Sequence, residues 1–312
     1  GRLSHQNISV LRAGYRIEPD PGKEDILDFA LWKKTTDSFE PSWSSPWGKG
    51  RPGWHIEDTA ISEKYFGLQY DLHGGAVDLK FPHHEAEIAQ AESLSGRRPF
   101  VKIWLHTGFL TISGQKMSKS LHNFITVDDF LKKYHPDVLR WLVLNRHYRS
   151  PLNYTSVSAS QSVNSLLSVK TFFAYLDSNR LTGSVRSSVS AAAAHFSKFF
   201  DESLNSDFAT PEAIAAIFSL MREINTLSSL NKSETRLIKK TLSSRFSVLG
   251  LSLHSSPIPD KIKELISRRE VLRTVRDFRR ADAVREEISA LGFRLDDTPS
   301  GPVVVKNDLE KI

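Results

Sequence analysis

Residues 112–121 read Ile-Ser-Gly-Gln-Lys-Met-Ser-Lys-Ser-Leu, and this stretch decides how the rest of the chain is interpreted. Two lysines, Lys116 and Lys119, stand three residues apart among serines, shortly after a glycine. The pattern predicts a mobile basic loop whose ammonium groups reach a polyphosphate, while hydroxyl and amide groups add hydrogen bonds. The alternative is a solvated surface loop, which is what most loops rich in Lys and Ser are.

Length and composition narrow the class of protein. The 312 residues suit about two domains, and 39% hydrophobic with 25% charged residues is typical of a globular protein. These fractions exclude a collagen, a coiled-coil rod and a wholly disordered chain. The absence of cysteine excludes disulfides and thiolate metal sites. No apolar run approaches the roughly 18 residues of a membrane span, and no signal peptide pattern is present. We therefore expect a cytoplasmic protein without a membrane partner.

The local composition changes near residue 135. Residues 1–135 are rich in Gly, Pro, Trp and His, with short apolar runs separated by turns, which predicts an α/β domain with functional loops. Here residues 70–79 predict a short strand, a Gly-Gly turn and a continuation, and Pro82 opens a helix over 83–94. Beyond residue 135 the pattern predicts helices and a final hairpin, at 136–144, 158–180, 188–204, 211–230, 233–249, 259–275, 279–291 and 293–305.

The charge is uneven along the chain. The net charge is +6, and between Asp260 and Arg285 nine Lys/Arg residues face five acidic ones. Ion pairs between residues four apart account for about half of this excess. The remainder is a candidate phosphate-contacting stripe. The aromatic residues of the predicted helices are assigned to the core rather than to base stacking, among them Phe172, Phe173, Phe199 and Phe200.

Residues 82–87, Pro-His-His-Glu-Ala-Glu, predict a metal site at the start of a helix. His83 and Glu87 are four residues apart, so both project from one helix face and can bind one ion, whereas His84 and Glu85 point elsewhere. Asp58 is the best placed third ligand. A carboxylate is a harder and less zinc-selective ligand than a thiolate. The alternative is a capped helix start that carries surface histidines.

His73-Gly74-Gly75 is a second candidate site. Two glycines after a strand let the backbone approach a ligand closely, with the imidazole of His73 at the mouth of a pocket. A plain tight turn is the other interpretation.

Several of these motifs together resemble one enzyme family. Lys116 to Ser120 is the KMSKS string of class I aminoacyl-tRNA synthetases. The accompanying strings closely resemble those of cysteinyl-tRNA synthetases, and the resemblance covers essentially the whole chain. These strings are Gly53–Glu57, His73–Gly75, Asp78–Glu85, Tyr148–Tyr154, Arg279–Arg285 and Asp297–Pro299.

The resemblance implies an α/β fold and a tRNA ligase. It implies a partial Rossmann-like class I synthetase catalytic domain over 1–135, followed by an all-α helical bundle with a small C-terminal hairpin. The bundle comprises a helical stem and anticodon-binding part over 136–255, and residues 256–312 form a basic tRNA-binding module. The implied reaction activates cysteine with ATP and transfers it to the 3′ end of tRNA(Cys).

The resemblance also implies roles for single residues. Asp58, His83 and Glu87 match the ligands of a zinc ion that selects the substrate thiolate. Trp54 and His73 match residues of the cysteine pocket, and Asp78 falls in the stretch facing the adenylate. Lys116 and Lys119 match the lysines that stabilise the phosphates of ATP, which binds with magnesium.

Three departures from the family pattern stand out. Asp58 replaces a usual cysteine, and Ala76 replaces the third glycine of an HGGG run. The HIGH motif and a further cysteine ligand, both from the family's N-terminal half, are absent. We therefore expect this chain to be the C-terminal portion of a longer enzyme, with the N-terminal part as a partner.

Two alternatives to a cysteine–tRNA ligase remain open. One is a non-catalytic tRNA- or ribosome-binding module derived from the synthetase. The other is a relative that joins activated cysteine to a small amine, against which the long helical half argues.

Overall fold

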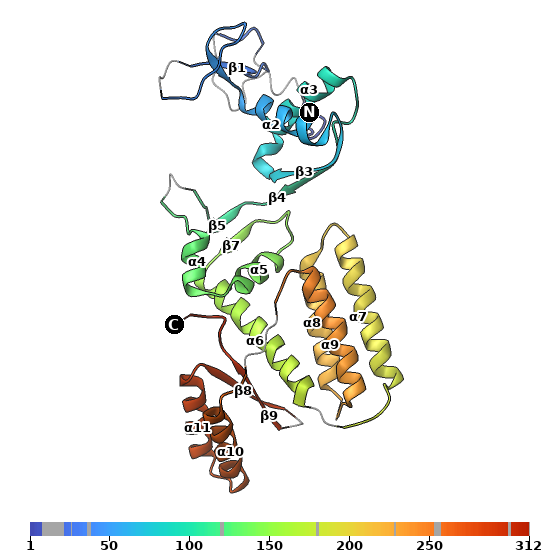
Figure 1. The fold of residues 1–312 in the computed structure, drawn as a ribbon, viewed down its shortest axis with the longest axis vertical. Coiled ribbons are helices and arrows are strands. Elements are labelled where there is room, and N and C mark those ends of the chain that lie inside the picture. The colour runs from blue at the N-terminus through green and yellow to red at the C-terminus, as the bar shows by residue number, and fades with distance from the viewer. Residues whose placement is uncertain are drawn as a thin grey trace. The chain divides into compact units, whose positions relative to one another are not determined.

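A computed structural model describes residues 1–7, 22–25, 27–35, 39–118, 122–178, 181–227, 229–252, 257–298 and 301–311. The chain separates into two compact units, Gly1–Phe109 and Leu110–Ile312, and the order of their elements can be followed in Figure 1. Each unit is described by itself below. The division by role at residues 135/136 and 255/256 stays a prediction.

The first unit is built around a βαβ element. Strand β3 (Tyr70–Ala76) leads through a 3₁₀ turn, η1 (Val77–Lys80), into helix α3 (His83–Ser95) and then into strand β4 (Val101–Thr107). The strands β3 and β4 are parallel, and α3 is part of the crossover between them. Helix α2 (Trp54–Phe66) packs against α3. A small antiparallel pair, β1 (Trp32–Lys34) and β2 (Gly50–Pro52), precedes α2.

The predicted turn at Gly74-Gly75 is wrong. Strand β3 continues through both glycines to Ala76, and all of its last four residues pair with β4. Position 75 has a glycine because there is no room for a side chain there. A Cβ atom there would lie 2.7 Å from Cε1 of His84 and 3.2 Å from Cδ1 of Leu79. Gly75 therefore allows close packing against an imidazole within a strand.

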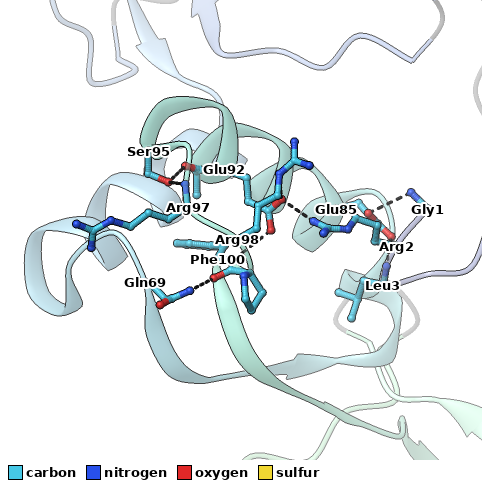
Figure 2. Close-up of polar contacts among 12 residues, drawn as sticks. Gly1, Arg2, Leu3, Gln69, Glu85, Glu92, Ser95, Arg97, Arg98 and Phe100 are labelled. Atoms are coloured by element: carbon cyan, nitrogen blue, oxygen red, sulfur yellow. Dashed lines mark hydrogen bonds and ion pairs between the residues drawn. The ribbon is translucent and has the colours of Figure 1, made fainter.

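The start of the chain is attached to one side of α3 by two glutamates, shown in Figure 2. The Glu85 carboxylate accepts hydrogen bonds from the backbone N–H groups of Leu3 and Ser4, each at 2.7 Å. Two turns later, Glu92 accepts from Arg2 at 2.5 Å and from the backbone N–H of Phe100 at 3.2 Å. These bonds orient α3 about its axis. A small core beside them contains Ile88, Ala91, Phe100 and Val101.

The second unit begins with a three-stranded sheet in the order β6-β5-β7. Strand β5 (Leu110–Ile112) pairs antiparallel with β6 (Gln115–Lys116) and parallel with β7 (Leu152–Tyr154). Between β6 and β7 lie α4 (Val127–Lys133) and α5 (Pro136–Leu144). Thr126 and His135 cap these two helices with their side chains, and Pro136 occupies the first turn of α5.

Four long helices follow and form the largest core. They are α6 (Ser156–Ser178), α7 (Ser187–Asn205), α8 (Thr210–Asn225) and α9 (Lys232–Val248). Their inward faces bury a continuous set of apolar side chains. Of the aromatic residues assigned to this core, Phe172 and Phe200 are buried, and Phe173 is partly buried and packs against the core. Phe199 is 44% exposed, because it lies one position outside the buried stripe of α7 that contains Phe196 and Phe200.

The C-terminal elements form a smaller core. Helices α10 (Asp260–Thr274) and α11 (Phe278–Ala290) pack on the antiparallel hairpin of β8 (Phe293–Thr298) and β9 (Gly301–Lys306). Because successive strand residues point to opposite faces, β9 joins two cores. Val303 and Val305 belong to the core of the long helices, and Val304 belongs to the core of α10 and α11.

The sequence-based α/β fold class with helices and a C-terminal hairpin is confirmed. The predicted basic stripe is partly internal to the fold, since Arg269 is buried and its guanidinium binds Asp297 through two bonds of 2.8 Å. Arg273 binds the same carboxylate at 2.6 Å. None of the helices in the described ranges combines the length and apolar character that a bilayer crossing requires.

Candidate functional site

Helices α2 and α3 bring three potential metal ligands together. Asp58 lies one turn into α2, and His83 and Glu87 lie four residues apart on α3. Nε2 of His83 lies 2.7 Å from Oδ2 of Asp58 and 3.0 Å from Oε1 of Glu87. The three side chains thus converge on one point, as the helical spacing of His83 and Glu87 predicts.

Glu87 is the most buried member of this group. Its side chain is fully buried, and neither of its carboxylate oxygens accepts a hydrogen bond from any described residue. Burial, and then the charge of Asp58, raise the pKa of Glu87 to about 8. Nε2 of His83, at 3.0 Å from Oε1, is close enough to donate but does not lie in hydrogen-bonding geometry. A buried carboxylate without a hydrogen bond is unfavourable unless it is protonated or bound to a cation.

A second imidazole, that of His55, contacts the Nδ1 side of His83. Nδ1 of His83 lies 2.6 Å from Nδ1 of His55, so one ring donates a hydrogen bond to the other. A cation held by Nε2 of His83 would require the ring proton to be on Nδ1, and His83 would then be the donor to His55. Burial, and then His83, lower the pKa of His55, which favours the neutral acceptor form. The indole ring of Trp54 covers His83 at 4.1 Å between ring centroids and is 55% exposed.

A further group of aromatic and imidazole side chains adjoins Glu87. Nδ1 of His73, from β3, lies 3.7 Å from Oε2 of Glu87 and 2.5 Å from the hydroxyl of Tyr70. The ring of Trp104, from β4, stacks on His73. His84 shares a hydrogen bond with His106 at 2.9 Å. Burial, followed by His73, His106 and His83, lowers the pKa of His84 to about 3, so this imidazole is neutral.

Lys116 lies in the second unit, at the end of a short hairpin. Ser113 and Gly114 form its turn with φ angles of 50° and 82°, as a tight two-residue hairpin turn requires. Below the lysine, Asn123 accepts a hydrogen bond from the N–H of Ser118 at 2.9 Å and donates one to the carbonyl of Lys116 at 3.1 Å. The other predicted loop lysine, Lys119, lies outside the described residues.

Comparison with known proteins decides the family. The family model of the class I (C) catalytic domain of tRNA synthetases matches residues 1–164, and the DALR domain model matches residues 199–254. The cysteine–tRNA ligase of Caldicellulosiruptor saccharolyticus is 42% identical over 97% of this chain and 67% of its own length. The chain belongs to the cysteine–tRNA ligase family.

Other members of the cysteine–tRNA ligase family are similarly close. The enzyme of Anoxybacillus flavithermus is 43% identical over 96% of this chain, and that of Methylococcus capsulatus is 42% identical over 96%. The chain spans 66–67% of the length of these relatives. Among solved structures, the LeuRS–tRNA–LeuAMS complex of Agrobacterium radiobacter K84 matches 68% of this chain and 34% of that chain, with a TM-score of 0.48 and 14% identity.

Five of the predicted site residues gather in the first unit of this cysteine–tRNA ligase family member. Asp58, His83 and Glu87 converge, Trp54 covers His83, and His73 approaches Glu87 from the other side. Asp78 lies on η1 and is exposed. The set of ligand atoms suits a divalent cation, because Glu87 offers two buried oxygens that accept no hydrogen bond in the described structure, beside one imidazole and one further carboxylate.

The sequence interpretation missed three histidines of this site. His55 and His84 stand in the family strings, but no role was derived for them, and His84 was expected to point away. Its ring instead lies within 5.1 Å of the centroids of His73, Trp104 and His106. His106 lies in β4, and only the pairing of β3 with β4 brings it here. The sequence did contain one indication of these histidines, since Trp54 directly precedes His55 and Trp104 stands two residues before His106.

Proposed function

We propose that this chain carries the cysteine-selecting and phosphate-binding parts of a cysteine–tRNA ligase. The observation that carries the proposal is the convergence of Asp58, His83 and Glu87 around a buried carboxylate that accepts no hydrogen bond in the described structure. The family membership supports it, because relatives with this name cover nearly the whole chain. We place the reaction in the cytoplasm.

Asp58, His83 and Glu87 are proposed to hold one zinc ion. When bound, an ion of this class supplies an open coordination position that accepts a thiolate and rejects a neutral hydroxyl. This matters because serine differs from cysteine by one atom, and an apolar pocket separates such isosteres poorly. Trp54 covers the ring of His83, and Nδ1 of His73 lies 3.7 Å from Oε2 of Glu87. We assign both to the cysteine pocket.

Lys116, Lys119 and Asp78 are proposed to serve the nucleotide. A carboxylate oxygen of cysteine attacks the α-phosphorus of ATP, the bond to the bridging oxygen breaks, and pyrophosphate leaves. The ammonium groups of Lys116 and Lys119 stabilise the negative charge on the phosphates, with magnesium as the counter-ion of ATP. Asp78 faces the adenylate. A ribose hydroxyl at the 3′ end of tRNA(Cys) then attacks the adenylate carbonyl and releases AMP.

The helical part is proposed to bind tRNA(Cys). The DALR domain model covers the end of α7 together with α8 and α9. In α10, α11 and the turn between them, Lys261, Arg276 and Arg279 are exposed and available to phosphates, whereas Arg269 is buried and binds Asp297. We further propose that the segment matching the remaining third of the relatives acts as a partner, in cis or in trans, that completes the catalytic domain.

The test is cysteine-dependent ATP–pyrophosphate exchange with serine as the control substrate. It is run on this chain and on this chain joined to the N-terminal third of a close relative. We expect exchange with cysteine and not with serine in the joined form. Absence of exchange in the joined form, with salt-dependent tRNA binding retained, would contradict the proposal and favour the non-catalytic RNA-binding module.

A further inference from the structure

The segment between α5 and α6 contains the family string Tyr148–Tyr154, which has no part in the function proposed above. It includes β7 and has polar contacts at both ends, all within the second unit. One end reaches the hairpin that carries Lys116. The other end reaches the connection between α7 and α8.

At the first end, Asn153 holds the hairpin turn. Its Oδ1 atom accepts a hydrogen bond from the backbone N–H of Gly114 at 2.9 Å and another from the hydroxyl of Thr111 at 3.0 Å. Strand β7 also pairs in parallel with β5, with Asn153 opposite Thr111. Because Thr111 pairs with Lys116 across the hairpin, the position of Asn153 bears directly on that of Lys116.

At the second end, Asp207 binds the two residues that begin the string. Its carboxylate accepts from the hydroxyl of Tyr148 at 2.6 Å, and from Nε and Nη2 of Arg149 at 2.6 and 3.0 Å. The guanidinium group lies over the Tyr148 ring at 5.1 Å. Two-point contact of this kind fixes the relative orientation of both groups, which a single surface ion pair does not.

The backbone at Asp207 is unusual. Asp207 and Phe208 have φ angles of 56° and 53°, a conformation that two successive non-glycine residues rarely adopt. The turn is closed by hydrogen bonds from the N–H groups of Phe208 and Ala209 to carbonyls at the end of α7. Such a conformation persists where the surrounding structure determines it, and here it directs the Asp207 carboxylate toward Tyr148 and Arg149.

We propose that Asp207 is a positioning residue for Lys116. Its bonds to Tyr148 and Arg149 fix the segment 147–153 against the α7–α8 turn. Asn153, at the end of this segment, then holds the hairpin through its hydrogen bonds with Gly114 and Thr111. The functional meaning of this link, a fixed phosphate-binding lysine, rests on the function proposed above. The mechanical link itself does not rest on that function. It connects Asp207, in the region matched by the DALR domain model, to the hairpin at the base of the KMSKS loop.

The test measures amide hydrogen exchange of the hairpin residues 110–118 in the full chain, without substrates. The variant Asp207→Asn removes the charge but keeps a residue type that tolerates positive φ. The control Asp201→Asn makes the same chemical change on α7 and breaks the Arg245–Asp201 pair (3.0 Å), which has no bond to residues 147–153. We expect exchange at Gly114 to rise at least threefold in Asp207→Asn and to stay unchanged in Asp201→Asn.

Two further variants guard this test. Asn153→Ala removes the acceptor of the Gly114 N–H and should raise its exchange at least as much as Asp207→Asn does. Tyr148→Phe removes one hydroxyl and should have a smaller effect in the same direction. Unchanged exchange in Asp207→Asn, or an equal rise in Asp201→Asn, would overturn the proposal. Because neither ATP nor cysteine is used, these results are independent of whether the chain takes part in ligation.

Discussion

Glu87 is the residue on which the proposed metal site depends most. Its raised pKa means that the metal-free folded chain binds a proton that the unfolded chain has released, between the ordinary value of 4.5 and about 8. Folding stability at this residue therefore falls as the pH rises through that interval. A cation that replaced the proton would remove this cost, which is why the proposed metal site includes Glu87.

The first prediction concerns the pH dependence of zinc affinity. Because Glu87 must lose its proton to bind, affinity should rise by up to about tenfold per pH unit between pH 6 and pH 8 and level off above. Calorimetric titration at several pH values measures this. Glu87→Gln should abolish binding, while Glu57→Gln, at an exposed position beside Asp58, should leave it intact. A flat pH profile would contradict this account of Glu87.

The second prediction uses the two neighbouring glycines of β3. Gly75→Ala places a methyl group 2.7 Å from the ring of His84, so the ring or the strand must move, at a cost of about 1–3 kcal/mol. Gly74→Ala meets nothing nearer than 3.9 Å and should change stability much less. Urea unfolding of both variants tests this. Equal losses would mean that close packing against His84 is not the reason for Gly75.

At the scale of elements, helix starts are the features most directly determined by local sequence. Asn231 begins α9 with a capping box, in which its side chain accepts from the N–H groups of Ser233 and Glu234 and the Glu234 side chain accepts from the N–H of Asn231. Such pairs satisfy backbone donors that the helix itself cannot. His135 and Thr126 cap α5 and α4 in a similar way, because their side chains accept hydrogen bonds from the N–H groups of Asp137 and Asp129.

The third prediction tests that cap. Asn231→Ala should lower the free energy of unfolding by about 1 kcal/mol, since it removes the acceptor for two backbone N–H groups. Asn231→Asp keeps this acceptor but not the Nδ2 group that donates to the carbonyl of Ser184 at 2.8 Å, so it should lose less than Asn231→Ala. Denaturant unfolding compares the two. A loss in Asn231→Asp as large as that in Asn231→Ala would show that the capping bonds do not account for the effect.

Local patterns predicted some elements and failed at others for identifiable reasons. The spacing of His83 and Glu87 predicted their common face, because a helix fixes residues four apart. The same reasoning predicted that His84 points away from the site, whereas His84 is buried and contacts His106. Helix spacing could not predict this contact, because it depends on the long-range pairing of β3 with β4. The turn expected at Gly74-Gly75 failed because glycine serves close packing as well as turns.

At the scale of the whole molecule, the chain consists of two units with different parts of the proposed chemistry. Asp58, His83 and Glu87 belong to the first unit and Lys116 belongs to the second. Asp58 and His83 are 25 residues apart, so helix spacing could not place them together. Asp58 was chosen from the sequence only as the best placed third ligand, and the resemblance to the family then matched it with His83 and Glu87.

The most direct test of the central claim is a spectroscopic titration of the cobalt-loaded chain with cysteine and with serine. Co²⁺ substitutes for zinc in such sites, and a thiolate bound to it gives an intense near-ultraviolet absorption band. We predict one Co²⁺ per chain, a new band on addition of cysteine but not of serine, and loss of binding in His83→Ala. Stoichiometric Co²⁺ binding without a cysteine-dependent band, or no binding, would contradict the claim that this site selects cysteine.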